Sequence, residues 1–241
     1  MSRTAATSVM MSICLTTGAC GSGIQSTPEP STSAPAPSTS QALPPISGSV
    51  AVAEERATPL DDVTDWLSWS DVAVVATITG DGLAPDQPTD DPGPEGSRTL
   101  LRDVHATIDD VVWTFPGDDP PVAAGEKITI TEATWMLVNE QRKTLRFPHT
   151  EHLEVGNTYV LFLTSSDNFP WRTIAPESHL KLVDGRVLSP IPGARDLDGG
   201  DPTEIAVELR STALHEDIAA LHELPMKERV SALMKQRSRT R

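Results

Sequence analysis

The sequence predicts a mainly β protein, a small antiparallel barrel or sandwich with a C-terminal helical appendage. About six or seven short runs between residues 72 and 188 are β-branched or alternate between apolar and polar residues, with no long helical pattern between them. Asp184-Gly185 stands between two such runs, which is a strong hairpin signal. Apolar residues at helical spacing begin only near Ile205.

The folded part is expected to begin with a short helix and a buried strand. Residues 61–69 carry aspartates at their start, where the helix dipole favours negative charge. Residues 72–79 are rich in β-branched side chains and precede Gly80-Asp81-Gly82, so they predict a buried strand ended by a turn. An acidic loop rich in proline and glycine is expected over residues 80–97.

A long strand is expected from about residue 100 to residue 115. Its apolar alternation changes phase by one residue at Asp109-Asp110, which predicts a β-bulge that bends the strand. Residues 127–131 alternate as well and predict another strand, continued to residue 138. Residues 139–152 are polar and are expected to form a loop.

The remaining strands are predicted between residues 159 and 188. Residues 159–164 are almost entirely apolar and predict a core strand, and residues 171–174 predict a short one. Residues 180–183 and 186–188 flank Asp184-Gly185 and predict a hairpin with a type I′ turn, which needs positive φ at both central residues.

The C-terminal part is predicted to be helical. Asp201 is placed as an N-cap, Pro202 as the first helical residue and Glu204 as the acid of a capping box. Apolar residues on one helix face continue this helix as far as Pro225. A second short helix is expected to follow, with an apolar side formed by Val230, Leu233 and Met234.

The chain is acidic, with a formal net charge of −15 over 241 residues. This charge argues against a nucleic-acid partner, because the phosphate backbone would be repelled. The last fifteen residues differ, since they contain six cationic residues and one acidic residue, Glu228. This basic tail either contacts anionic lipid headgroups or is a solvated helix end whose cations suit the helix dipole.

The first twenty residues resemble a bacterial lipoprotein signal peptide. They contain Arg3, a short apolar run and the junction Gly18-Ala19-Cys20. A charged start, a hydrophobic stretch and small residues at the cleavage site are the physical requirements of such a segment. The resemblance implies that Cys20 is diacylated, becomes the new N-terminus and tethers the protein to the outer face of the cytoplasmic membrane.

The sequence therefore predicts four parts. They are a signal peptide over 1–19, the lipidated Cys20 with a disordered Ser/Pro/Thr-rich linker over 20–59, a β-barrel head domain over 60–195, and C-terminal helices with a basic tail over 196–241. Prolines between residues 28 and 45 favour an extended spacer. Because Cys14 would be removed with the signal peptide, the mature chain is expected to have no pair of thiols.

A second resemblance concerns the predicted head. It rests on Ser-Asp-Val-Ala-Val-Val-Ala-Thr-Ile-Thr over 70–79, the bent long strand, Leu-Glu-Val-Gly-Asn-Thr-Tyr-Val-Leu-Phe-Leu over 153–163, and the hairpin at Asp184-Gly185. This order resembles secreted bacterial lipoproteins with an OB-like barrel, akin to the netrin-like modules of metalloproteinase inhibitors. The resemblance covers about residues 60–190 and implies an OB-like fold. Netrin-like modules use N-terminal cysteines, and beyond Cys20 none exists here, so protease inhibition is not implied.

The densest group of metal-ligand residue types is His149, Glu151 and His152, which predicts a candidate zinc site. Pro148 precedes it and Gly156 follows, so a helical metalloprotease arrangement is not expected. In an extended strand residues 149 and 151 would share one face while residue 152 points away. A polar loop without metal is the alternative.

Two further groups have both a structural and a functional interpretation. Asp196, Asp198, Asp201 and Glu204 are compatible with calcium, but their spacing departs from the EF-hand and helix capping accounts for them equally. The five tryptophans are either large core residues or exposed rings that stack on sugars.

The sequence thus favours a non-enzymatic, membrane-tethered lipoprotein without a cofactor, whose head binds a protein or a polymer of the cell envelope. The alternative is a metal-dependent hydrolase using His149, Glu151 and His152, and a third possibility is a purely structural envelope component. Stoichiometric zinc in the purified protein would separate the hydrolase from the other two.

Overall fold

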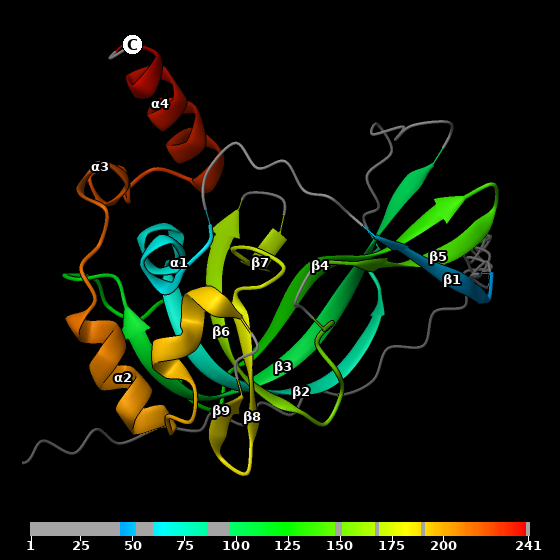
Figure 1. Cartoon of the computed structure of the whole chain (residues 1–241), viewed down its shortest axis with the longest axis horizontal. Coiled ribbons are helices and arrows are strands. Elements are labelled where there is room, and N and C mark those ends of the chain that lie inside the picture. The colour runs from blue at the N-terminus through cyan, green and yellow to red at the C-terminus, as the bar shows by residue number, and fades with distance from the viewer. Residues whose placement is uncertain are drawn as a thin grey trace, which may run out of the picture. The chain divides into compact units, whose positions relative to one another are not determined.

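The computed structural model describes residues 44–51, 60–85, 97–147, 151–166, 169–188 and 191–239. All of them belong to one compact unit over residues 42–241 (Figure 1). The predicted signal peptide, Cys20 and His149 lie outside the described residues. Within those ranges, no helix is long and apolar enough to cross a membrane.

The protein is mainly β with short C-terminal helices, as the sequence predicts. The strands are β1 Ile46–Ala51, β2 Val72–Leu83, β3 Arg98–Thr114, β4 Lys127–Val138, β5 Gln141–Arg146, β6 Thr158–Ser166, β7 Phe169–Thr173, β8 His179–Val183 and β9 Arg186–Leu188. The helices are α1 Val63–Trp69, α2 Pro202–Ser211, α3 Glu216–Ala219 and α4 Met226–Arg239, with a 3-10 helix over Pro192–Leu197.

The described strands form one mixed sheet in the order β1-β5-β4-β3-β2-β6-β8-β9. Off this path, β7 pairs with both β4 and β6. Strands β2, β3 and β4 are consecutive and antiparallel, and β6 returns to pair beside β2, which is a Greek-key arrangement. Figure 1 shows β1 and β5 at the opposite end of this sheet from β8 and β9.

The first part of strand β2, residues 72–78, is buried on both faces, which explains its nearly continuous apolar sequence. On one face of β2, Val72 and Val74 belong to an apolar cluster with residues of β3 and β4 and with Leu153 and Leu161. Their neighbours on the other face belong to a second cluster, which contains Ala73, Val75, Trp66, Trp69, Phe162, Ile205, Leu209, Ile218 and Leu233. The C-terminal helices therefore share one core with the sheet.

The predicted bulge in the long strand is confirmed. Val75 and Ala76 are consecutive in β2, but they pair with Asp110 and Ile108 of β3, so Asp109 is left unpaired. In the same way, Val112 is left unpaired between the partners of Ala73 and Val74. Each of these extra residues on β3 bends the strand. The bend lets residues on both sides of the bulges stay buried, including Ile108 and Trp113.

Two turns and one cap follow the sequence prediction. Asp184 has φ 51° and Gly185 has φ 76°, as a type I′ hairpin between β8 and β9 requires. Asp201 caps α2 and forms the predicted capping box with Glu204. The helix predicted to reach Pro225 is interrupted, because Thr212 is extended and α3 begins as a separate turn.

Two strands form where the sequence predicts none. Residues 46–51 lie in the predicted linker but form β1, which pairs in parallel with β5. Strand β5 itself lies in the predicted polar loop over 139–152. Its hairpin with β4 turns at Asn139 and Glu140, which both have positive φ. These mainly polar strands have no apolar alternation, so the pattern that identifies the other strands is missing.

Candidate functional site

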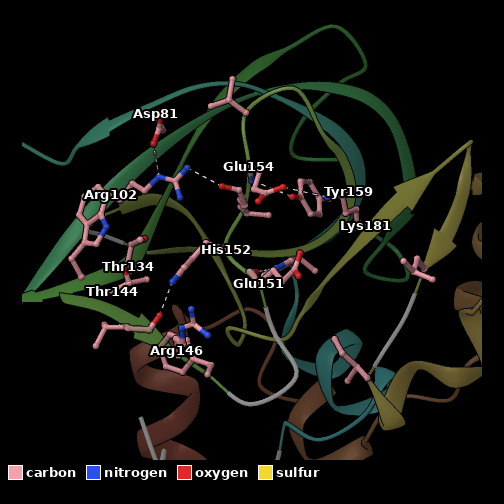
Figure 2. A pocket seen from close by; sticks show the side chains of 18 of the residues that line it. Asp81, Arg102, Thr134, Thr144, Arg146, Glu151, His152, Glu154, Tyr159 and Lys181 are labelled. Carbon is pink, nitrogen blue, oxygen red and sulfur yellow. Dashed lines mark hydrogen bonds and ion pairs between the residues drawn. The ribbon is translucent and has the colours of Figure 1, made fainter. Parts of the chain in front are cut away.

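A cleft of about 1240 Å³ opens in the described part of the protein. It is lined by side chains from β2, β3, β4, β5, β6 and β8 and by the segment between β5 and β6 (Figure 2). Its lining includes Asp81, Arg102, Thr134, Trp135, Arg146, Phe147, Glu151, His152, Glu154, Tyr159, His179, Lys181 and Asp198. The cleft thus combines charged groups of both signs with aromatic rings.

The wall of the cleft contains an irregular segment, Glu151–Glu154, which we call the strap. Side chains from three strands hold its backbone. His179 Nε2 donates to the Glu151 carbonyl at 2.7 Å, and Arg102 Nη2 donates to the Leu153 carbonyl at 2.8 Å. The Glu154 N–H donates to the Tyr159 hydroxyl at 3.1 Å. Because Leu153 is also fully buried, the strap is fixed at its centre as well as at both ends.

Arg102 is the centre of the charged network. Its side chain is 8% exposed, and its Nε lies 2.8 Å from Asp81 Oδ2. Its Nη1 donates to Glu132 Oε1 at 3.3 Å. Arg102 and Glu132 are direct cross-strand partners on β3 and β4, which places the two side chains together. One guanidinium therefore joins two carboxylates and the strap, as Figure 2 shows for Asp81 and the strap.

Glu132 has an unusual protonation equilibrium. Burial raises the pKa of its carboxyl from 4.5 to about 7, although the nearby Arg102 and a hydrogen bond from Thr134 act to lower this pKa. Desolvation of a carboxylate is costly, so the neutral acid is favoured unless the opposite charge compensates fully. Near neutral pH this side chain is therefore present both as an acid and as a carboxylate.

The two histidines of the cleft are neutral at neutral pH. Burial lowers the pKa of His179 to about 4, and burial also lowers the pKa of His152. His152 Nε2 donates to the Leu145 carbonyl at 2.7 Å, just as His179 Nε2 donates to the strap. A neutral ring that donates through Nε2 has an unprotonated Nδ1. Nδ1 of His179 is buried and has no hydrogen-bond partner.

A smaller cavity of about 150 Å³ adjoins the cleft, and we call it the recess. Phe147, His152 and His179 line both cavities. Glu132 and Arg172 line the recess as well. The buried acid and both neutral histidines thus border the same small space.

The predicted zinc site is only partly covered by the described residues. Glu151 and His152 lie on the strap, whereas His149 lies outside the described residues. His152 uses Nε2 for the Leu145 carbonyl, so only its Nδ1 remains for a metal. No group of three or more metal-ligand residues occurs within the ranges the structure describes. The zinc site stays a prediction.

Several of the other sequence candidates have structural roles. Asp201 and Glu204 form the reciprocal bonds of the capping box. Of the tryptophans, Trp66, Trp69 and Trp113 are buried in the core. Trp135 is partly exposed at the cleft, with the guanidinium carbon of Arg142 4.9 Å from its ring centroid.

A second buried arginine fastens α4 to the sheet. Arg229 is 5% exposed, and its Nη2 donates to Asp71 Oδ1 at 2.7 Å. Its other nitrogens donate to the carbonyls of Trp69 and Leu224. Asp71 Oδ2 accepts from the Ser165 N–H at 2.8 Å. This arrangement joins α4 to the ends of α1 and β6.

Arg102, Glu132 and His179 are not predicted as site residues from the sequence. Arg102 and Glu132 interrupt apolar strands with charges, which is a weak signal of a buried ion pair. Nothing local connects them, since the register of β3 against β4 brings them together.

Comparison with protein-family models, with curated proteins and with solved structures finds no match. The function is therefore inferred from the geometry of the cleft and from the sequence.

Proposed function

We propose that this protein is a lipid-anchored, non-enzymatic binding protein on the outer face of the cytoplasmic membrane. Its ligand is a protein or a polymer of the cell envelope, and the cleft takes up that ligand. The observation that carries the proposal is the cleft of about 1240 Å³, in which buried polar groups and aromatic side chains converge. Such a combination is typical of binding sites.

A binding role fits the way the polar groups are used. Both cleft histidines donate to main-chain carbonyls. A nucleophilic enzyme instead needs a base hydrogen-bonded to a hydroxyl or thiol. Arg102 is similarly engaged by two carboxylates and a carbonyl. These contacts make the walls of the cleft rigid, which lowers the entropic cost of binding a ligand.

We also infer that the head is a small OB-like barrel formed by β2, β3, β4, β7 and β6. Its support is the pairing of β7 with two strands at once. Trp171 of β7 pairs in parallel with Ile130 of β4, and Thr173 pairs with Leu163 of β6. A sheet whose last strand pairs with both sides has no edge between them.

The lipid anchor rests on the sequence Gly18-Ala19-Cys20 and is tested by Cys20→Ser. We expect wild-type protein in the membrane fraction, with an N-terminal mass raised by acyl chains. The Cys20→Ser protein should lose this mass and leave the membrane, because its hydrocarbon anchor is missing. Cys14→Ser is the matched control and should behave as wild type. An unmodified amino end, or wild-type protein recovered only from cytosol, contradicts the anchor.

Binding is tested with isolated cell envelopes. The full-length Cys20→Ser protein and the detergent-extracted wild type should both co-sediment with envelopes in a saturable manner. Using both preparations separates ligand binding from insertion of the acyl chains. Absence of saturable binding by either preparation contradicts the proposed function.

A further inference from the structure

The recess is bordered by hydrogen-bonding side chains from several elements. His179 is one of them, and its unprotonated Nδ1 has no hydrogen-bond partner among the described residues but is covered, so a ligand pairs with it only after the ring shifts. His152 presents an unprotonated Nδ1 as well, because its Nε2 donates to Leu145. The volume of about 150 Å³ has room for several groups of the size of a water molecule.

Donors and charges are mixed with these acceptors. Arg172 lines the recess beside Glu132. The larger cleft has the same balance, with the cations Arg102, Arg146 and Lys181 and the anions Asp81, Glu151, Glu154 and Asp198. A strongly charged ligand of either sign would therefore meet like charges. An apolar ligand would cover polar groups without pairing them.

A neutral ligand rich in hydroxyls matches this lining. Each hydroxyl donates one hydrogen bond and accepts two, so it pairs with histidine nitrogens, carboxylates and guanidinium groups alike. Phe147 and Trp135 add partly exposed aromatic surface at the same cleft, suited to the apolar face of a sugar ring. The volume of about 1240 Å³ exceeds the range of about 300–1,000 Å³ that is usual for small-ligand sites, so the cleft has room for more than a single sugar unit.

We infer that the cleft binds a neutral oligosaccharide segment of a cell-envelope polysaccharide, with hydroxyls of one sugar unit in the recess beside His179 and Glu132. This inference rests on the proposed function and names its ligand class. The proposed function leaves two ligand classes, a protein or a polymer of the cell envelope, and this inference assigns the polymer.

The ligand class is tested on the envelopes used above. Full-length Cys20→Ser protein is added to envelopes that were oxidised with periodate, which cleaves the vicinal diols of sugars, or digested with protease. Binding should be lost after periodate and kept after protease. The opposite result overturns the oligosaccharide inference while leaving the proposed binding function intact. No saturable binding to untreated envelopes overturns both.

The location is tested by His179→Gln. The glutamine amide can still donate to the strap in place of Nε2, but the acceptor Nδ1 is removed. We expect about tenfold weaker binding, as for one lost hydrogen bond at a buried site. His222→Gln is the matched control, because Nδ1 of His222 is also buried without a partner but borders a different cavity. It should bind as wild type.

A second variant keeps the test decisive if His179→Gln does not fold. Phe147 is only partly exposed at the cleft and lies outside both core clusters, so Phe147→Ala should fold and bind at least tenfold more weakly. Equal binding by wild type and by the folded variants overturns the assignment of the ligand to this cleft.

Discussion

At the scale of single residues, two buried arginines connect segments that are far apart in the sequence. Arg102 joins Asp81 and Glu132 to the strap, and Arg229 joins α4 to Asp71. Guanidinium suits this role because its five N–H donors lie in a plane and reach several acceptors at once. A lysine ammonium in the same position would leave part of these acceptors unpaired.

Removing Arg229 should destabilise the protein. Arg229→Met leaves Asp71 without its cation and two carbonyls without their donor, so we expect a loss of about 3 kcal/mol in the free energy of unfolding. Urea unfolding measures it. Arg186→Met is the control, because both interactions of Arg186, the 3.6 Å ion pair with Glu204 and the hydrogen bond to the Gly199 carbonyl, are exposed to solvent. That variant should lose less than about 1 kcal/mol. Equal losses would contradict a structural role of the buried pair.

Glu132 should make stability depend on pH. Its pKa is raised to about 7 in the folded protein, because the carboxyl is buried, from the usual 4.5. Between these pH values the folded state holds the proton more tightly than the unfolded state. The stability contributed by this group is therefore present below about pH 4.5 and is lost as pH rises to about 7.

The variant Glu132→Gln isolates this effect. Relative to the variant, wild type should lose up to about 3 kcal/mol of unfolding free energy as pH rises from about 4.5 to about 8. Urea unfolding at a series of pH values gives the difference. The exposed Glu208→Gln is the control for the same substitution at a solvent-exposed position. A constant difference between wild type and Glu132→Gln across this range would refute the raised pKa.

At the scale of elements, the 3-10 helix Pro192–Leu197 packs directly on the start of α1. A Cβ added to Gly193 would lie 2.7 Å from Cα of Asp62, and the Asp61 carbonyl oxygen is closer still. Backbone atoms cannot move aside as a flexible side chain does. Glycine is therefore required at this contact because of space and not because of its φ angle.

Gly193→Ala should accordingly lower the free energy of unfolding by about 2 kcal/mol or more, since overpacking forces two backbone segments apart. Thermal or urea unfolding tests this expectation. Gly82→Ala is the control, because a Cβ there meets nothing within 4 Å and the φ angle is ordinary. It should be neutral or slightly stabilising, since glycine weakens a strand. A neutral result for Gly193→Ala would show that the two segments are not in contact.

Some of the strands and helix ends can be predicted from local sequence patterns, and others cannot. Strands β6, β8 and β9 and the cap of α2 follow from alternation, turn residues and capping chemistry, which are local properties. Strand β5 carries mostly polar side chains, and β1 is almost entirely exposed, so neither has an apolar face to reveal it. Their positions depend on pairing with distant residues.

At the scale of the whole molecule, the cleft is the part that the sequence predicts least. Glu151 and His152 are predicted from the sequence as site residues because they are adjacent in the chain. Arg102, Glu132 and His179 come from three strands, and only the sheet register and the strap bring them to one place. The site is thus a product of tertiary structure, whereas its most visible residues belong to a short local motif.

The pairing of β1 with β5 has a consequence for the reach of the proposed tether. Cys20 and Ile46 are 26 positions apart, whereas Cys20 and Leu60 are 40 apart. At about 3.5 Å per extended residue, the segment between Cys20 and the paired strand can span at most about 90 Å. If β1 separated from β5, this maximum would rise to about 140 Å, an increase of about 50 Å. In the protein anchored as proposed, one weakly buried edge strand would thus set the largest distance between the lipid surface and the cleft.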